Sequence, residues 1–409
     1  MRFASNLTAP GSPLRNRPLL ILAAGHFTVD MYSGMLPVLF PAFRDQFNLD
    51  LGTVGLVSLA YTGMASVSQP VFGLLADRFG TRFTGIAQIW TSVFFAILGF
   101  VPNFPMLLLF AGLAGIGSGW FHPFGALNAG AVIRERQRNT AMSMYISGGT
   151  VGVALGPLIG ALLVSVFGLR GLGFMVIPGT LIGTWLLFAM RDLAVKGRPK
   201  LLAGETRKRQ IVPYAMIAVV VGVMMLRQVP TIGVENFIPS WYKDMGYSAP
   251  FYSALATTVV LATAIGALGV GSLADQYGRR TVMLVTMILT VPAVWFFTEF
   301  PGNWAFLSGA CIGFLAASTS PILLVMSQQL MKGRAGAASG LILGLGFISG
   351  AVATPVFGSI ADAHGMQSAL RILMGIVVLS IGVAWFLPTE AHIAKFVSSS
   401  TPELETKPA

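Results

Sequence analysis

Two titratable side chains, His26 and Asp30, lie four residues apart inside a long apolar stretch near the start of the chain. Residues at positions i and i+4 share one face of a helix, so the imidazole and the carboxylate can interact. A carboxylate inside a membrane-length segment is costly and normally faces a cavity or a partner, and a histidine titrates near neutral pH. The pair is interpreted as a proton-coupling site or a substrate anchor. A static hydrogen bond between helices is the alternative.

A second apolar stretch carries Arg227 and Glu235, with Pro230 and Gly233 between them. Proline and glycine can interrupt a membrane helix and leave backbone groups open to a cavity. Arg227 is therefore a candidate to bind an anionic substrate or to pair with Asp30. Glu235 is a further proton-coupling candidate, although a solvated position near the outer end of its helix explains it equally well.

His122 stands next to Pro123 among aromatic residues. It is a candidate substrate-binding residue, and a buried, hydrogen-bonded histidine is the alternative interpretation. Other aromatic and amide side chains in the apolar stretches are candidates to line a cavity, although such aromatic residues also serve as packing and interface anchors. These candidates are Tyr32, Tyr61, Gln69, Trp120, Phe237 and Gln328.

The composition indicates which solvent surrounds these residues. The 409 residues are 55% hydrophobic and 10% charged, whereas a soluble domain carries about 25% charged residues. That difference excludes a soluble enzyme, a nucleic-acid-binding module and a disordered scaffold. Twelve apolar stretches are each long enough for a membrane helix. They cover residues 18–41, 52–76, 83–101, 105–131, 140–166, 171–190, 213–241, 250–274, 281–300, 303–329, 336–361 and 368–388.

The 26 Lys and Arg residues are concentrated in one set of connections between these stretches. Positive charge accumulates on the cytoplasmic side of membrane proteins, so we expect both termini and the basic segment 191–212 in the cytoplasm. The same topology explains the net charge of +11 without a nucleic-acid partner. The single cysteine, Cys311, cannot form an internal disulfide, and we expect it to be buried in a helix.

The chain repeats itself at an offset of 198 residues. The segment that contains Asp77 corresponds to the one that contains Asp275, and prolines and glycines in other apolar stretches match at the same offset. Such a repeat predicts an all-α integral membrane protein of two six-helix halves, with a site between them near mid-membrane. We assign residues 1–190 to an N-terminal six-helix bundle, 191–212 to a cytoplasmic basic linker, and 213–409 to a C-terminal six-helix bundle with a short cytoplasmic tail.

These residues resemble the major facilitator superfamily. The loop at 73–82 is similar to that superfamily's signature Gly-x-Leu-Ala-Asp-Arg-x-Gly-x-Arg. Within the superfamily the chain resembles the fosmidomycin-resistance exporters, and the likeness rests on His26-Phe-Thr-Val-Asp30-Met, Ser68-Gln69-Pro70, Gly117-Ser-Gly-Trp-Phe-His122-Pro123 and Gly333-Arg334-Ala-Gly336-Ala-Ala-Ser339-Gly340. The resemblance implies twelve transmembrane helices in two pseudo-symmetric bundles, in a bacterial cytoplasmic (inner) membrane. Phe124 stands where that family's pattern has a glutamate.

The same resemblance implies a cytoplasmic gate, in which Asp77 docks on span eleven and Asp275 on span five. A carboxylate is favourable there because the N-terminus of a helix carries positive charge. Gly73 and Gly80 permit close packing and a tight turn, and topological charge beside a turn is the alternative reading. The gate residues are Gly73, Asp77, Arg78, Gly80, Arg82, Asp275, Gly278, Arg279 and Arg280.

The segment Gly152-x-x-x-Gly156-Pro157-x-x-Gly160 looks like the motif associated with antiporters in this superfamily. Small residues four apart let two helices approach closely, and proline bends a membrane helix. Ordinary helix packing, with no bearing on the direction of transport, is the alternative interpretation.

The chain lacks the nucleotide-binding Gly-Lys-Ser/Thr loop, HExxH and Gly-x-Ser-x-Gly patterns, so we expect no enzyme activity, no cofactor and no metal site. The expected function is secondary active transport by alternating access: a proton-coupled antiporter that exports a small organic compound or drug, as in multidrug efflux. A proton symporter or facilitator that imports a metabolite is the main alternative, and a receptor without transport is the other. The expected partners are a small-molecule substrate, protons and the lipid bilayer, with one chain sufficient for function.

Overall fold

The computed structural model describes residues 16–132, 138–196, 213–317, 319–331 and 335–400, and all regular secondary structure in these ranges is helical. The first half contains α2 (Arg17–Phe47), α3 (Leu51–Ser58), η2 (Leu59–Gly63), α4 (Met64–Phe79), α5 (Thr84–Ile97), α6 (Phe104–Ala131), α7 (Arg138–Phe167), η4 (Leu169–Met175) and α8 (Val176–Leu193). The second half contains α9 (Tyr214–Asp244), α10 (Ala249–Tyr277), α11 (Arg279–Glu299), α12 (Trp304–Ala317), α13 (Thr319–Leu330), α14 (Ala335–His364), α15 (Met366–Ala384) and α16 (Glu390–Ser400).

The described residues form twelve apolar helical segments, which confirms the twelve predicted stretches. Ten of these segments are long and apolar enough to cross a bilayer as they stand. The other two contain the shorter apolar helices Thr84–Ile97 and Trp304–Ala316, and α13 follows the second of these. Two spans are composite, because the π-helical turn η2 joins α3 to α4 and the 3-10 turn η4 leads into α8.

Short polar residues and glycines mark the ends of these helices. Asn16 and Asn103 are N-caps whose side chains accept hydrogen bonds from the backbone N–H groups of Leu19 and Met106, which satisfies donors that have no partner inside the helix. Gly80 and Gly278 end α4 and α10 with φ of 80° and 85°. Only glycine adopts this conformation readily, and the two positions are 198 residues apart, so the repeat extends to the backbone.

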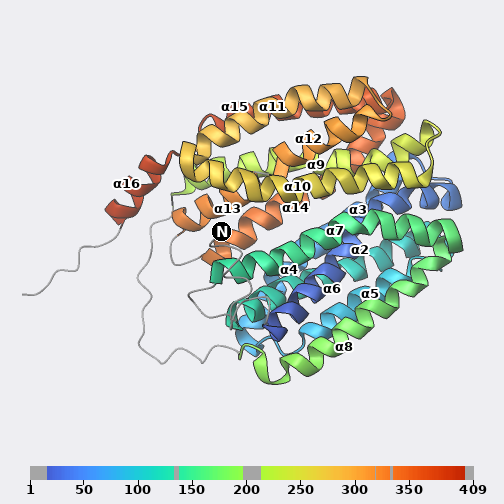
Figure 1. Cartoon of the computed structure of the whole chain (residues 1–409), viewed down its shortest axis with the longest axis horizontal. Helices are drawn as coiled ribbons and strands as arrows, with labels where there is room; N and C mark the ends of the chain where they lie inside the picture. Colours follow the sequence, from blue (N-terminus) through green and yellow to red (C-terminus); the bar gives the residue numbers. More distant parts are fainter. Residues whose placement is uncertain (1–15, 133–137, 197–212, 318, 332–334, 401–409) are drawn as a thin grey trace, which may run out of the picture.

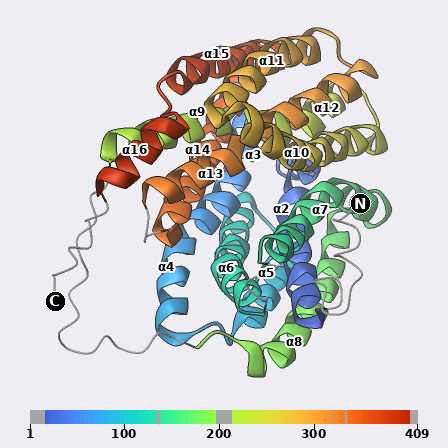
Figure 2. The same cartoon turned by 60° about the vertical axis from the view of Figure 1, so that its left-hand side comes forward.

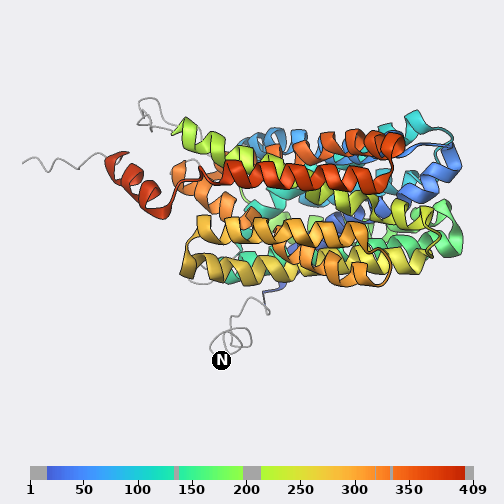
Figure 3. The ribbon, with the colours of Figure 1, turned by 90° about the horizontal axis from the view of Figure 1, so that it is seen from above.

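The helices form the two predicted bundles. Figure 1 shows α2 to α8 together in one half of the molecule and α9 to α15 in the other. Figures 2 and 3 show the same two groups from other sides, and in Figure 3 the helices of both groups run along one common axis. The fold is a twelve-helix membrane bundle with two pseudo-symmetric halves.

Large apolar side chains are exposed on the outside of this bundle, as expected where lipid is the solvent. Leu74, Phe188 and Phe386 are each more than two-thirds exposed. Cys311 on α12 is also exposed, so the prediction that it is buried was wrong. An apolar sequence environment does not indicate burial in a membrane protein, because lipid accepts apolar side chains as well as a core does.

A helix beyond the last span, α16, was not predicted. Its first residue, Glu390, accepts a hydrogen bond from the backbone N–H of Arg279 at 2.7 Å, and Ile393 is buried against the second half. The carboxylate therefore caps the N-terminus of α11, where a negative charge is favourable. Figure 3 shows α16 projecting from one end of the bundle.

Polar contacts join the two halves at one end of the molecule. We call the end that contains Phe47 and Asp244 the outer end, and the end where α8 stops and α9 begins the linker end. At the outer end Arg44 forms an ion pair with Asp244, in which Nη1 donates to both carboxylate oxygens at 3.0 and 2.9 Å, and Lys243 forms an ion pair with Asp45. These pairs hold the C-terminal ends of α2 and α9 together.

Helices α3 and α14 also meet closely at the outer end. Asp362 on α14 accepts hydrogen bonds from the backbone N–H groups of Leu51 and Gly52 at 2.9 and 2.7 Å. A Cβ at Gly55 would lie 2.9 Å from the backbone of Pro355, and one at Gly358 would overlap the backbone of α3. Small residues therefore let the halves pack backbone to backbone here, and the outer end is closed.

Candidate functional site

Three titratable side chains meet in the first half, and we call them the triad. His26 Nε2 lies 3.2 Å from Asp30 Oδ2, and His122 Nε2 lies 3.4 Å from Asp30 Oδ1. His26 and Asp30 are one turn apart on α2, as the sequence predicts, and α6 supplies His122. The carboxylate is thus bracketed by two imidazoles, one on each oxygen.

The backbone of α7 determines how His26 is protonated. His26 Nδ1 lies 2.9 Å from the carbonyl oxygen of Tyr145, and a carbonyl oxygen only accepts hydrogen bonds. Nδ1 therefore carries a proton, and Nε2 is the atom that faces Asp30. Two arrangements satisfy the contact: an imidazolium that donates to a carboxylate, or a neutral imidazole that accepts from a protonated carboxyl. Both place one proton between Nε2 and Oδ2.

The triad is accessible but enclosed by helices. The side chains of Asp30 and His122 are 17% and 27% exposed, while their contacts come from α2, α6 and α7. A carboxylate surrounded in this way does not face acyl chains. Among the residues that the structure describes, these three form a group whose donor atoms could hold a metal ion, because the atoms all lie within 4.8 Å of one another. At separations of 3.2 and 3.4 Å the side chains contact one another directly.

The predicted antiporter motif on α7 packs against the helix that bears Asp30. A Cβ at Gly152 would overlap the carbonyl of Phe27, and one at Gly156 would lie 2.6 Å from the backbone of Gly34. At Gly160 it would lie 2.8 Å from a methyl group of Val38. The motif therefore has the close-packing role that its glycines predict, and Pro157 lies inside the same helix.

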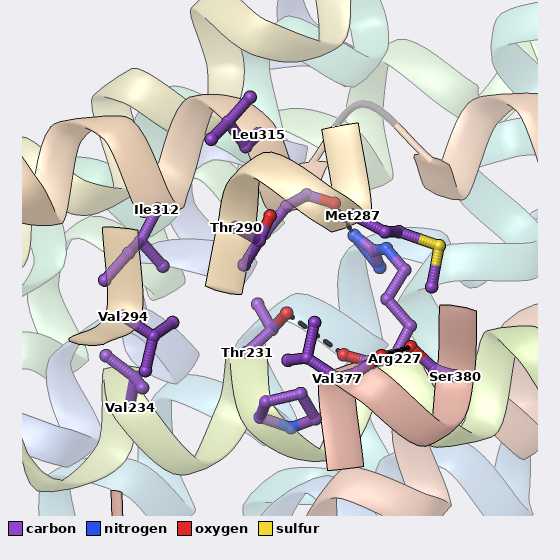
Figure 4. A pocket seen from close by; sticks show the side chains of 12 residues that line it. Arg227, Thr231, Val234, Met287, Thr290, Val294, Ile312, Leu315, Val377 and Ser380 are labelled. Atoms are coloured by element: carbon purple, nitrogen blue, oxygen red, sulfur yellow. Dashed lines mark hydrogen bonds between the residues drawn. The ribbon is translucent and has the colours of Figure 1, made fainter. Parts of the chain in front are cut away.

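Arg227 extends into a cavity within the second half. Its guanidinium donates to the carbonyl of Ala316 on α12 and, at 3.4 Å, to Gln228 Oε1. The cavity of about 20 Å³ has room for about one water molecule, and Figure 4 shows it between α9, α11, α12 and α15. Glu235, two turns further along α9, is half-buried. The structure thus directs Arg227 toward α12, while Asp30 contacts His26 and His122.

The other candidate lining residues are spread through the bundles. Tyr32 is fully buried and its hydroxyl donates to the carbonyl of Met175 at 2.9 Å. Tyr61 is buried in the π-helical turn of span two, and Phe237 is buried where α9 meets α2 and α14. Trp120 stacks on Phe72. Gln69 is half-buried on α4, and the side chain of Gln328 lies outside the described part of the chain.

The predicted gate lies at the linker end. The side chains of Asp77 and Asp275 lie outside the part of the chain that the structure describes, so their docking stays a prediction. Arg78 and Arg82 lie over the rings of their neighbours Phe79 and Phe83. Arg279 donates to Gln329 at 2.6 Å, and Arg280 lies over Trp385. A Cβ at Gly73 would meet no atom within 4 Å, so this conformation does not have the close packing expected there.

Sequence reasoning missed two residues of α7 that touch the triad. Tyr145 stacks on the His26 ring with centroids 4.3 Å apart, and a Cβ at Gly149 would overlap the Asp30 carboxylate. The adjacent glycines 148 and 149 are a signal of close helix approach. No pattern in the sequence indicates which helix Tyr145 faces.

Comparisons with known proteins agree with this architecture. A model of the Major Facilitator Superfamily matches residues 22–254 and 233–407. The uncharacterised MFS-type transporter YfnC of Bacillus subtilis (strain 168) is 28% identical over 393 residues, which cover 93% of this chain and 95% of that protein. The fosmidomycin resistance protein of Escherichia coli (strain K12) is 25% identical over 384 residues, covering 91% and 92%.

Two solved structures share the fold at low sequence identity. A bacterial homologue of the human lysosomal transporter Spinster superposes with a TM-score of 0.75 at 14% identity, covering 96% of this chain and 100% of that one. The nucleoside transporter NupG superposes with a TM-score of 0.70 at 14% identity, covering 91% and 100%. These matches support the twelve-helix arrangement itself.

Proposed function

This chain belongs to the Major Facilitator Superfamily and is a secondary transporter rather than an enzyme, and we propose that it exports a small organic compound in exchange for protons. The protein is a multi-pass membrane protein that acts on small molecules. In this proposal it lies in a bacterial inner membrane with its linker end in the cytoplasm and works as a monomer.

The triad is the observation that carries the proton coupling. A carboxylate with an imidazole on each oxygen, inside a membrane bundle, is a site that binds one proton or one charged ligand group at a time. At the repeat offset of 198, Met224 and Gln228 occupy the positions equivalent to His26 and Asp30. Neither side chain titrates, so the His26–Asp30 pair has no titratable counterpart at the equivalent positions of the second half.

Exchange requires the site to open to one side at a time. The closed outer end, with its ion pairs and its α3–α14 contact, corresponds to a state whose site opens toward the linker end. Three contacts must break together for the outer end to open. They are the ion pairs Arg44–Asp244 and Lys243–Asp45 and the hydrogen bonds from the N-terminus of α3 to Asp362. Docking of Asp77 and Asp275 would then close the linker end.

Export rather than import is supported by two observations. The glycine–proline motif on α7 looks like the motif associated with antiporters in this superfamily, and one relative of similar length is named for fosmidomycin resistance. Arg227 is proposed as an anchor for an anionic group, with Glu235 as a second titratable residue. A symporter or facilitator is the alternative function.

Transport by the purified protein in liposomes tests the proposal. We expect fosmidomycin, or a hit from a growth-challenge panel, to release protons from vesicles with an imposed pH gradient. Asp30→Asn should abolish this proton-linked transport while substrate-for-substrate exchange continues, because exchange needs no net proton movement. Glu299→Gln, which removes a carboxylate paired with Arg371 at the outer end, is the matched control and should behave like the native protein.

Three outcomes would overturn parts of the proposal. Proton-linked transport by Asp30→Asn would refute the assignment of Asp30. Accumulation of substrate together with inward protons would identify a symporter. Transport that ignores the pH gradient in the native protein would identify a facilitator.

A further inference from the structure

The contact between His26 and α7 fixes which ring nitrogen can exchange a proton. Tyr145 holds the imidazole twice, through its carbonyl oxygen at 2.9 Å from Nδ1 and through its own ring, stacked at 4.3 Å and 20°. His26 is 8% exposed. Releasing the Nδ1 proton would leave the carbonyl facing a bare nitrogen, and both atoms would be acceptors without a donor. The variable proton therefore belongs to the Nε2 side.

Gly149 lies one turn beyond Tyr145 on the same face of α7. A Cβ at this position would overlap Asp30 Oδ2 and would lie 2.7 Å from His26 Nε2. The bare Cα of Gly149 therefore leaves the space in which these two atoms meet. Any side chain at residue 149 would push the carboxylate or the imidazole aside.

We propose that α7 positions the proton site: the Tyr145 carbonyl holds His26 in the Nδ1-protonated form, and Gly149 leaves room for the proton to be shared between His26 Nε2 and Asp30 Oδ2. This inference rests on the proposed proton coupling and names positioning residues for it. Because Gly152 and Gly156 fix α7 against α2, a shift of α7 changes the geometry of the shared proton. Proton binding and helix movement are then linked through one helix pair.

The titratable groups around Asp30 come from four elements. His26 lies on the same helix, His122 on α6, Tyr145 on α7 and Tyr61 in the π-helical turn of span two. His122 contacts the other carboxylate oxygen, Oδ1. His122 can adjust the charge on Asp30, but it does not lie between His26 Nε2 and Asp30 Oδ2.

Nitrogen-15 NMR of histidine-labelled protein in lipid nanodiscs tests the protonation state directly. The chain has four histidines, and His26→Asn, His122→Asn, His364→Asn and His392→Asn variants assign the signals. We expect Nδ1 of His26 to remain protonated across the titration, with only Nε2 changing. A His26 whose Nδ1 loses its proton, or which is protonated on Nε2 alone, would overturn the inference.

Transport variants test the role of Gly149. Gly149→Ala should move the pH midpoint of proton-linked transport by about one unit or more, the size expected when a hydrogen bond to a charged group is lost. Substrate-for-substrate exchange should persist. Gly375→Ala is the matched control, because a Cβ there meets no atom within 4 Å, and its pH profile should be native. An unchanged profile in Gly149→Ala would contradict the positioning role.

A second pair of variants keeps the test decisive if Gly149→Ala does not fold. Tyr145→Phe preserves the ring stack and the carbonyl and should retain the native pH profile, whereas Tyr145→Leu loses the stack and should shift it. Equal profiles in these two variants would overturn the role of the Tyr145 ring, while the NMR titration tests its carbonyl. If the NMR result holds but transport ignores the pH gradient, the proposed coupling fails and the positioning stands. If transport is proton-linked but Nδ1 titrates, the positioning fails and the coupling stands.

Discussion

His26 and His122 contact the same carboxylate, but the structure holds them differently. His26 is fixed by a carbonyl, a stacked ring and a 3.2 Å contact with Asp30. His122 makes two longer contacts of 3.4 Å, one to Asp30 and one to Ser118 on its own helix. Hydrogen bonds weaken at such distances, so the two imidazoles are held unequally. In the proposed coupling, His26 shares the proton and His122 adjusts the charge around it.

This difference predicts unequal effects of matched substitutions. His26→Gln should lower the rate of proton-linked transport by about tenfold or more, since a charge-assisted hydrogen bond is lost. His122→Gln should lower it by only about two- to threefold, since its contact is longer and more exposed. Initial rates in liposomes measure both, with His392→Gln on the exposed α16 as control. A larger loss in His122→Gln than in His26→Gln would contradict the asymmetry.

For individual side chains, the sequence predicts contacts between residues that are close together along the chain. His26 and Asp30 are one turn apart on one helix, so their contact follows from spacing alone. His122 remained ambiguous between a ligand and a core residue, because nothing local tells which face of span four meets Asp30. One of the two contacts of Tyr145 with His26 is made by its backbone carbonyl, and a carbonyl leaves no trace in the residue type. Asp77 and Asp275 stay predictions.

Among the elements, α3 is the one whose N-terminus joins the two halves. Asp50 caps it from its own half, accepting from the Thr53 backbone N–H at 2.6 Å, and hydrogen bonds from the Thr53 side chain and backbone lower the pKa of Asp50. Asp362 caps the same turn from the other half. Two carboxylates at a helix N-terminus are favourable. Of these two caps, only the one from Asp362 must break when the outer end opens.

Asp362→Ala should therefore shift the protein away from the closed outer end. The loss of a helix cap costs about 1 kcal/mol, which corresponds to a roughly fivefold change in the ratio of closed to open molecules. Ser58→Cys in a Cys311→Ala background reports opening, because Ser58 is buried beside Asn236 of the other half. We expect faster labelling by an impermeant maleimide. Asp50→Asn, which keeps a good cap within one half, should leave the labelling rate unchanged.

The spans were predicted well because hydropathy alone determines them, whereas their internal details were not. The π-helical turn around Tyr61 and the helix α16 depend on which neighbours each segment meets. The segment 390–400 is short and partly polar, so its hydropathy does not indicate a helix. Their helix is stabilised by tertiary contacts such as the one between Glu390 and the N-terminus of α11.

For the whole molecule the repeat offset of 198 correctly predicts two matched bundles, but it does not predict which end is closed. Both conformations of an alternating-access transporter share one sequence, so the choice depends on small differences between sets of contacts. The structure adds that Asp45 and Lys243, which pair across the halves, are themselves 198 residues apart. Equivalent residues meet only beside a pseudo-two-fold axis, which therefore passes between these two side chains at the outer end.

A charge exchange across this axis provides a test at the scale of the whole molecule. Asp45→Lys and Lys243→Asp should each weaken the closed outer end by about two- to fivefold, the range expected for an exposed ion pair. The double variant should restore closure, because the end of α2 would then be basic throughout and the end of α9 acidic. Labelling of Ser58→Cys measures closure, and added salt should reduce both single effects. A double variant that opens as readily as either single one would show that the pair does not control closure, leaving Arg44–Asp244 and Asp362 as the contacts that do.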